Sequence, residues 1–140
     1  MVALVNVGTP TFLDRIDLHV EVPLVDFRDL SSSSDEEKSA SIRTRVVSAR
    51  QTQIERFKKS ATTTNAGMTA RQVRQYCQLD FEGAGYLEHA MEIMNFSARA
   101  HDRILKVART LADLGGSPAI RPNDVLEAIQ YRSLDRKLFS

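Results

Sequence analysis

The residues best placed for chemistry are Arg99 and Arg103, which stand one turn apart at the start of a helix predicted over residues 97–116. A cation in the first turn of a helix is disfavoured by a few tenths to about 1 kcal/mol, because the free N–H groups there carry partial positive charge. The two arginines are therefore poorly placed for stability alone, but well placed to hold an anion such as a phosphate. The alternative, that both pair with neighbouring acids or face solvent, is favoured on spacing alone.

The helix that positions these arginines is the clearest element of the sequence. Ser97 is a natural N-cap, and Gly115 and Gly116 suit a helix end. Apolar residues recur at steps of three and four and predict a buried face made of Ile104, Leu105, Ala108, Leu111 and Ala112. The opposite, polar stripe is predicted to hold Arg99, Arg103, Lys106, Thr110 and Asp113.

The chain of 140 residues is long enough for one domain with a core, and its net charge is only +1. The charge is uneven, however, because eight basic residues and one acid, Glu55, fall between residues 41 and 74. Phosphate contacts from such a run would make nucleic-acid binding steeply dependent on salt. The run lacks the interleaved aromatic residues of a single-strand binder. The candidate contacts are Arg43, Arg45, Arg50, Lys58 and Lys59.

Several classes of protein and site are disfavoured by the composition. Cys77 is the only cysteine, which precludes an intrachain disulfide and favours a cytoplasmic protein. The chain has neither an apolar run of membrane-spanning length nor a secretory leader, so we expect no membrane partner. The three histidines are far apart in sequence and lack ligand-type partners at helical spacing, so no metal site is predicted. Three residues are interpreted as structural: His19 on the predicted strand, His101 on the buried side of its helix, and Cys77 on an apolar helix face.

The sequence predicts a mainly α fold, a helical bundle preceded by one orphan β-strand. Residues 16–22 alternate apolar and polar side chains, with Ile16, Leu18, Val20 and Val22 on one face, as a half-buried strand does. No convincing second strand follows, so we expect this one to be displaced, frayed or paired with another copy. The missing sheet points to a fragment of a larger protein.

Five helices are predicted after the strand. The first begins at Ser34 or Asp35 and ends near Phe57, and the others cover residues 69–78, 80–95, 97–116 and a stretch after Pro122. Their expected inward side chains are Ile42, Val46, Ala49, Gln53 or Ile54, Phe57, Val73, Tyr76, Cys77, Ala84, Leu87, Ala90, Met91, Met94, Val125, Leu126, Ala128 and Ile129. Residues 1–11 match nothing around them and are interpreted either as an authentic strand or as a remnant of an expression vector.

The chain lacks a phosphate-binding loop of the type G-x-x-x-x-G-K-[ST], and it lacks an apolar strand ending in Asp-Glu that would hold magnesium. We therefore expect no ATP hydrolysis by this chain alone. Four ordered blocks nevertheless resemble the C-terminal part of magnesium-chelatase-like AAA+ ATPases, in their bacterial competence-protein branch. They are FLDRIDLHVEVP (12–23), NAGMTARQVRQYCQLD (65–80), FSARAHDRILKVARTLADL (96–114) and EAIQYRSLDR (127–136).

The resemblance implies that residues 12–30 end an AAA+ core and that residues 31–140 form its helical lid. The full-length protein would then bind ATP and Mg²⁺ through upstream motifs. It would pack its lid on that upstream core and meet neighbouring subunits in a ring, expected to be a hexamer, as a motor acting on DNA. The alternatives are a helical nucleic-acid-binding module and a chelatase subunit for metal insertion.

The resemblance also assigns roles to arginines. Arg15 matches the arginine finger, which reaches into the nucleotide of the neighbouring subunit, and Arg99 matches the sensor-2 arginine, with Arg103 in support. Each would stabilise charge on the phosphoryl group during its transfer. The alternative for Arg15 is a local ion pair with Asp14 or Asp17.

Overall fold

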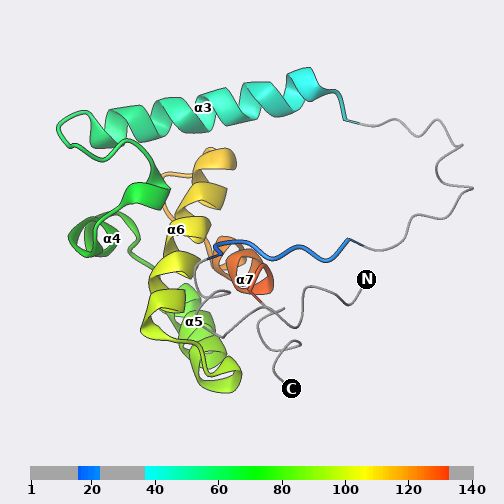
Figure 1. Cartoon of the computed structure of the whole chain (residues 1–140), viewed down its shortest axis with the longest axis vertical. Helices are drawn as coiled ribbons and strands as arrows, with labels where there is room; N and C mark the ends of the chain where they lie inside the picture. The colour runs from blue at the N-terminus through cyan, green and yellow to red at the C-terminus, as the bar shows by residue number, and fades with distance from the viewer. Residues whose placement is uncertain (1–15, 23–36, 133–140) are drawn as a thin grey trace, which may run out of the picture.

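The computed structural model describes residues 16–22 and 37–132. Within these residues the chain is mainly α-helical, as predicted, and contains no β-strand (Figure 1). The helices are α3 (Ser39–Phe57), α4 (Ala70–Tyr76), α5 (Phe81–Met94), α6 (Ala98–Leu114) and α7 (Pro122–Gln130), with a 3₁₀ turn, η1 (Asn65–Gly67), between α3 and α4.

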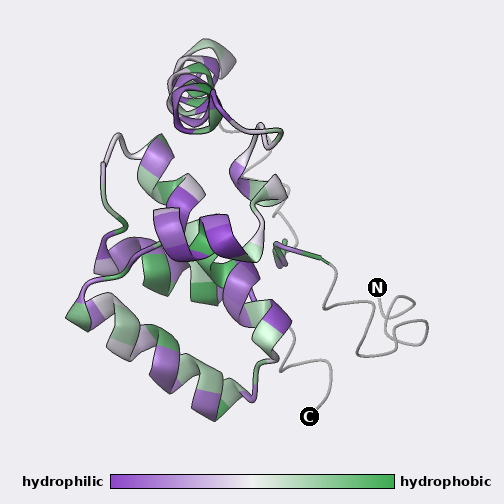
Figure 2. Ribbon diagram, turned by 90° about the vertical axis from the view of Figure 1, so that its left-hand side faces the viewer, coloured by the Kyte–Doolittle hydropathy of each residue, from purple (hydrophilic) through white to green (hydrophobic). Residues whose placement is uncertain are grey.

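Helix α6 is the centre of the bundle. It packs against α3, η1, α4 and α7, and α5 packs against α7 on the far side (Figure 1). The predicted buried face of α6 is confirmed at Ile104, Ala108 and Ala112, which are fully buried, while Leu111 is only half-buried. In both views α3 and α5 lie at opposite ends of the molecule (Figures 1 and 2).

The predicted helix starts after residue 65 are confirmed by their caps. Thr69 accepts a bond from the backbone N–H of Gln72 (3.3 Å), and the side chain of Gln72 accepts one from Thr69 in return. Asp80 accepts a bond from the N–H of Gly83 (2.7 Å), and Ser97 from that of Ala100 (3.2 Å). These side chains satisfy N–H groups that the first turn of a helix leaves free.

The prediction for α3 names the correct buried face but extends the burial too far toward the N-terminus of the helix. Ala49, Gln53 and Phe57 are buried, but Ile42 and Val46 on the same face are 43% and 45% exposed. The reason is that α3 packs on α6 only through its C-terminal half, while its N-terminal half projects beyond the bundle (Figure 1). The proposed caps Ser34 and Asp35 lie outside the described residues. Of the alternatives Gln53 and Ile54, Gln53 is the buried one. Smaller corrections concern Ala84 and Leu126, which are exposed.

The strand predicted over residues 16–22 is absent. The segment is extended without regular pairing, and its alternation fails as a guide to burial, because Ile16, Leu18, Val20 and Val22 are exposed while His19 is buried. A strand needs a neighbour to satisfy its backbone groups, and no other described segment offers one. The prediction of an orphan strand is therefore wrong for this segment, and its pairing with another copy stays a prediction.

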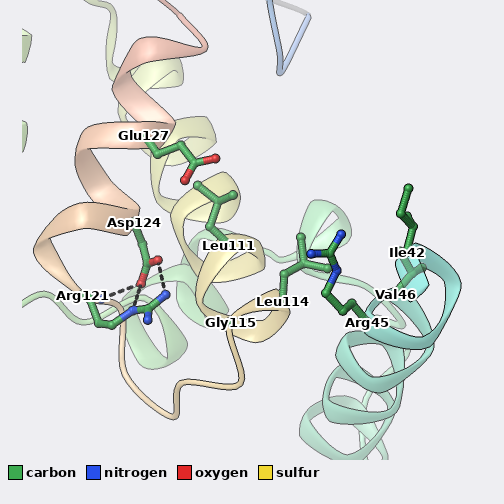
Figure 3. Close-up of a pocket in the computed structure, with 9 residues that line it drawn as sticks. All are labelled: Ile42, Arg45, Val46, Leu111, Leu114, Gly115, Arg121, Asp124 and Glu127. Atoms are coloured by element: carbon green, nitrogen blue, oxygen red, sulfur yellow. Dashed lines mark hydrogen bonds and ion pairs between the residues drawn. The ribbon is translucent and has the colours of Figure 1, made fainter. Parts of the chain in front are cut away.

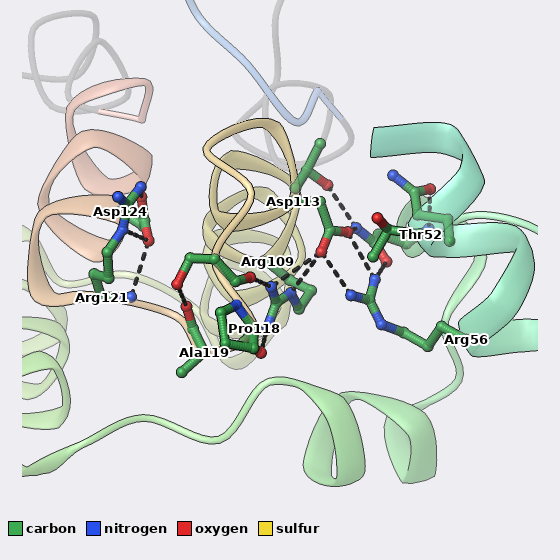
Figure 4. Close-up of polar contacts among 12 residues, drawn as sticks. Thr52, Arg56, Arg109, Asp113, Pro118, Ala119, Arg121 and Asp124 are labelled. Carbon is green, nitrogen blue, oxygen red and sulfur yellow. Dashed lines mark hydrogen bonds and ion pairs between the residues drawn. The ribbon is translucent and has the colours of Figure 1, made fainter. Parts of the chain in front are cut away.

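A buried carboxylate, Asp113, ties α6 to its surroundings, although the sequence placed it on the polar stripe. Its side chain is 0% exposed and accepts two bonds from Arg56 (2.6 and 2.7 Å) and one from Asn65 (2.8 Å) (Figure 4). Arg109 donates to the same carboxylate (3.2 Å) and to the backbone carbonyls of residues 117 and 118. One anion thus joins α3, η1, α6 and the turn that follows α6.

The charge state of Asp113 follows from two opposing influences. The largest single influence is burial. It would raise the pKa of Asp113, because it removes the carboxylate from water. The hydrogen bonds from Arg56 and Asn65 and the charges of Arg109 and Arg56 outweigh it, so the pKa of Asp113 lies below its ordinary value. Asp113 is therefore ionised at neutral pH.

This arrangement predicts acid sensitivity. A carboxylate with a lowered pKa contributes stability that is fully present above its unfolded pKa of about 3.9 and is lost as the pH falls through its folded pKa. We expect Asp113→Asn to destabilise the domain by about 3–5 kcal/mol at pH 7, because it leaves Arg56 and Arg109 near a neutral group. The variant should also lose part of the drop in stability below about pH 4. Urea denaturation between pH 7 and pH 3 tests both expectations, with the half-exposed Asp102→Asn as control. Equal stability of Asp113→Asn and wild type at pH 7 would contradict the structural role of Asp113.

Candidate functional site

Arg99 is an exposed residue in the first turn of α6. The hydroxyl of Ser97 already caps this turn, accepting a bond from the N–H of Ala100 (3.2 Å). Arg99 makes no hydrogen bond or ion pair with any residue that the structure describes. The helix thus begins with an unpaired cation beside a partial positive charge, a combination that a bound anion would relieve.

Arg103 has a different setting from Arg99. Its guanidinium forms an ion pair with Asp17, and the two side chains are 30% and 47% exposed. The pair ties the extended segment 16–22 to α6, across most of the chain length. For Arg103, the interpretation that it pairs with a neighbouring acid is therefore confirmed. Arg15, the predicted finger, lies outside the described residues, and its role stays a prediction.

The same segment is anchored a second time, at the end of α7. The backbone N–H of His19 donates to the carbonyl of Tyr131 (2.7 Å), and Arg132 donates to the carbonyl of Ile16 (2.7 Å). Arg132 is completely buried, which sequence reasoning missed. Its only signal was a place directly after the apolar face of the last helix, inside the block that resembles the family.

A groove runs under the projecting half of α3, and Figure 3 shows its lining. Its volume is about 400 Å³, and apolar residues of α3 and α6 face it together with charged residues around α7. The charged groups are already paired, since Arg121 binds Asp124 (2.8 Å), Arg45 binds Glu37 (2.9 Å) and Glu127 accepts from Tyr131 (3.0 Å). Every charged group that lines the groove therefore already has a partner. The groove is lined by Ile42, Arg45, Val46, Leu111, Leu114, Gly115, Arg121, Asp124 and Glu127.

The five basic candidates for nucleic-acid contacts are all exposed on α3 or in the turn after it, and they divide into two groups. Arg45 pairs with Glu37, and Lys58 pairs with Glu55 (both 2.9 Å). The remaining three have no ion pair with a described residue: Arg43, Arg50 and Lys59. As expected, the nearby aromatic rings serve the core, where Phe57 and Tyr76 meet edge to face at 5.6 Å.

The other chemical candidates are structural. Burial raises the pKa of Cys77 to about 11, so the thiol is protonated and inert at neutral pH. His101 was expected on the buried side of its helix but is half-exposed. Its Nδ1 lies 3.1 Å from Oδ1 of Asp102. Over residues 16–22 and 37–132, no group of three potential ligands could hold a metal ion. Within the same part of the chain, every helix is too short or too polar to cross a membrane.

Comparison with known proteins identifies the family. A profile described as "Magnesium chelatase, subunit ChlI C-terminal" matches residues 36–132. The chain belongs to this family. It is 40% identical over 128 residues to the "Competence protein ComM" of Haemophilus influenzae and 41% identical over the same length to the "Uncharacterized protein YifB" of Escherichia coli (strain K12). It is also 30% identical over 120 residues to the "Uncharacterized protein Mb2921c" of Mycobacterium bovis.

These alignments cover 91% of the chain for ComM and YifB and 86% for the mycobacterial protein, but only 24% of each relative. The chain thus spans about a quarter of the length of the curated relatives it matches. The resemblance to the C-terminal region of magnesium-chelatase-like proteins is confirmed.

The ion pair between Arg103 and Asp17 predicts a local effect. Removing either side chain should loosen segment 16–22 from the bundle, with a coupling energy below about 1 kcal/mol because both groups are partly solvated. Hydrogen exchange at the amide of His19 should accelerate in Arg103→Ala and in Asp17→Ala, while the amides of α6 stay protected. Arg99→Ala is the matched control and should alter neither this exchange nor global stability by more than about 0.5 kcal/mol. Unchanged exchange at His19 in both variants of the pair would refute the anchoring role.

Proposed function

We propose that this chain is the helical lid of a magnesium-chelatase-like AAA+ ATPase and that Arg99 is its sensor-2 arginine. The observation that supports this role is the unpaired, exposed guanidinium at the start of α6, in a position that is unfavourable for stability. Membership of the magnesium chelatase family supplies the context, since the profile covers all of α6.

The proposed chemistry is electrostatic. A guanidinium approaching the terminal phosphate of ATP would stabilise negative charge on the phosphoryl oxygens during its transfer, and the planar fork of arginine suits two of those oxygens at once. ATP and Mg²⁺ would be held by the upstream core of the same protein, because the described residues supply neither a phosphate loop nor a cluster of metal ligands. The lid would contribute Arg99 to a site built mainly elsewhere.

Arg103 fits a positioning role beside Arg99. Its contact with Asp17 attaches α6 to the segment that follows Arg15 in the chain. We propose that Arg15 acts as the finger for the neighbouring subunit of a ring, expected to be a hexamer. The link through Asp17 would then couple the position of the lid to the base of that finger.

The decisive test is made in the full-length ATPase. Arg99→Ala should reduce ATP hydrolysis by several orders of magnitude, because an arginine acting in the transition state can be worth about 10³–10⁵ in rate. The melting temperature of this variant should stay near that of wild type, since Arg99 makes no hydrogen bond or ion pair with the described part of the bundle. Arg99→Lys should recover little activity, because it restores charge without the fork.

The matched control is Arg74→Ala, which removes an exposed arginine from α4. It should leave both turnover and melting unchanged. A melting temperature lowered by many degrees in Arg99→Ala, together with normal turnover of the folded fraction, would refute the sensor role and make Arg99 a structural residue.

Action on DNA is a second candidate, supported by the three basic residues Arg43, Arg50 and Lys59, which are exposed and lack acidic partners among the described residues. If they bind phosphates, replacing all three by alanine should weaken binding of fluorescent duplex DNA to the chain at about 50 mM salt. The slope of log affinity against log salt should also become shallower by about 0.9 for each phosphate that the variant no longer neutralises. The control is replacement of Arg45 and Lys58, which are paired with acids. Equal salt slopes for wild type and the triple variant would refute this candidate.

A further inference from the structure

One exposed stripe of α3 combines two cations with two aliphatic side chains. Arg43, Val47, Arg50 and Ile54 follow one another at steps of four, three and four, which places them along one face of the helix. Val47 and Ile54 are 59% and 56% exposed, and neither arginine pairs with a described residue. This face is adjacent to the face of α3 that packs on α6, and no other helix of the bundle covers it.

An exposed stripe of α5 has the same spacing and the opposite charge. Phe81, Gly85, Glu88 and Glu92 again follow at steps of four, three and four. Phe81 is 96% exposed, and Glu88 and Glu92 form no ion pair with a described residue. Helix α5 contains no lysine or arginine, and it carries three exposed glutamates: Glu82, Glu88 and Glu92.

We infer that the α3 stripe of one copy of this chain docks against the α5 stripe of another. The two stripes match in spacing, carry opposite charge, and each presents an apolar side chain near one end. Since α3 and α5 lie at opposite ends of the bundle, one copy cannot satisfy its own stripes (Figures 1 and 2). Contact between two different surfaces is head-to-tail, and such contacts generate rings or filaments.

The pairing has a defined register when the helices run antiparallel. Ile54 then meets Phe81, and Arg43 meets Glu92, and the two contacts are eleven positions apart on both helices. In this register Val47 lies opposite Glu88 and Arg50 lies opposite Gly85. Gly85 faces open space, so the long side chain of Arg50 can pass over it toward Glu88. A parallel arrangement would pair Arg50 with Glu88, but it would place Arg43 against Phe81 and leave Ile54 against Glu92.

The size of the surface limits its strength. A single pair of helix faces is smaller than the roughly 1,200 Å² buried in a stable complex, so the association should be weak and concentration-dependent. Because the charges stay near solvent, it should also weaken between about 50 and 500 mM salt, as the Debye length shortens. The contact between the two stripes does not depend on nucleotide. Its test is therefore independent of the test of Arg99.

Charge reversal with mixing tests the inference by sedimentation velocity up to millimolar concentrations. Wild-type chain should associate at low salt, whereas Arg43→Glu/Arg50→Glu and Glu88→Lys/Glu92→Lys should each stay monomeric, because each presents two stripes of like charge. An equimolar mixture of the two variants should associate again, since every stripe then finds an opposite one. The control Arg71→Glu/Arg74→Glu, on the exposed surface of α4, should behave like wild type.

Four outcomes would overturn the inference. They are a monomeric wild type at every concentration, a mixture that stays monomeric while wild type associates, association of either reversed variant alone, or an equal effect of the α4 control. A monomeric wild type whose α3 arginines bind duplex DNA would assign the α3 stripe to nucleic acid instead.

Discussion

Asp113 brings a carboxylate into the interior of the bundle, and the surrounding elements are placed so that donors reach it. A charge removed from water is unfavourable by several kcal/mol unless it is paired and hydrogen-bonded. Here α3 supplies Arg56, η1 supplies Asn65 and α6 supplies Arg109. Since Arg56 lies in the last turn of α3, the network fixes that helix by its C-terminal end, and the N-terminal half is left to project past α6.

The helix that carries Asp113 could be predicted from sequence, but the burial of Asp113 could not. The cap at Ser97 and the apolar arc of Ile104, Ala108 and Ala112 depend only on local geometry, and the structure reproduces them. Arg109 and Asp113 lie on the flank of that arc, one turn apart, where a helical projection expects solvent. Their burial depends on which other elements cover the flank, and in particular on Arg56, which is 57 residues away in the chain.

The same difference between local and long-range information explains the errors on α3 and on segment 16–22. A periodic stripe shows which face of a helix turns inward, but it does not show where the neighbouring helix ends, so Ile42 and Val46 remain exposed. An alternating pattern predicts a strand only if a partner strand exists. In segment 16–22 the backbone instead bonds to Tyr131 and Arg132, and an ion pair to Arg103 completes the attachment. The position of Arg99 needed no such information, because a helix start is specified by its own cap.

The arginines of the described chain divide by what they contact, and the division bears on function. Arg56, Arg109 and Arg132 are wholly or largely buried and bind carboxylates or backbone carbonyls inside the bundle. A second group is exposed and has no hydrogen-bond or ion-pair partner among the described residues: Arg43, Arg50, Arg71, Arg74 and Arg99. The remaining three form ion pairs near the surface: Arg45, Arg103 and Arg121. The first group holds the fold, so its replacement would report mainly on folding. The second group contributes little to stability. At Arg99 it also opposes the helix dipole, so an explanation for the position of Arg99 is best sought in a phosphate.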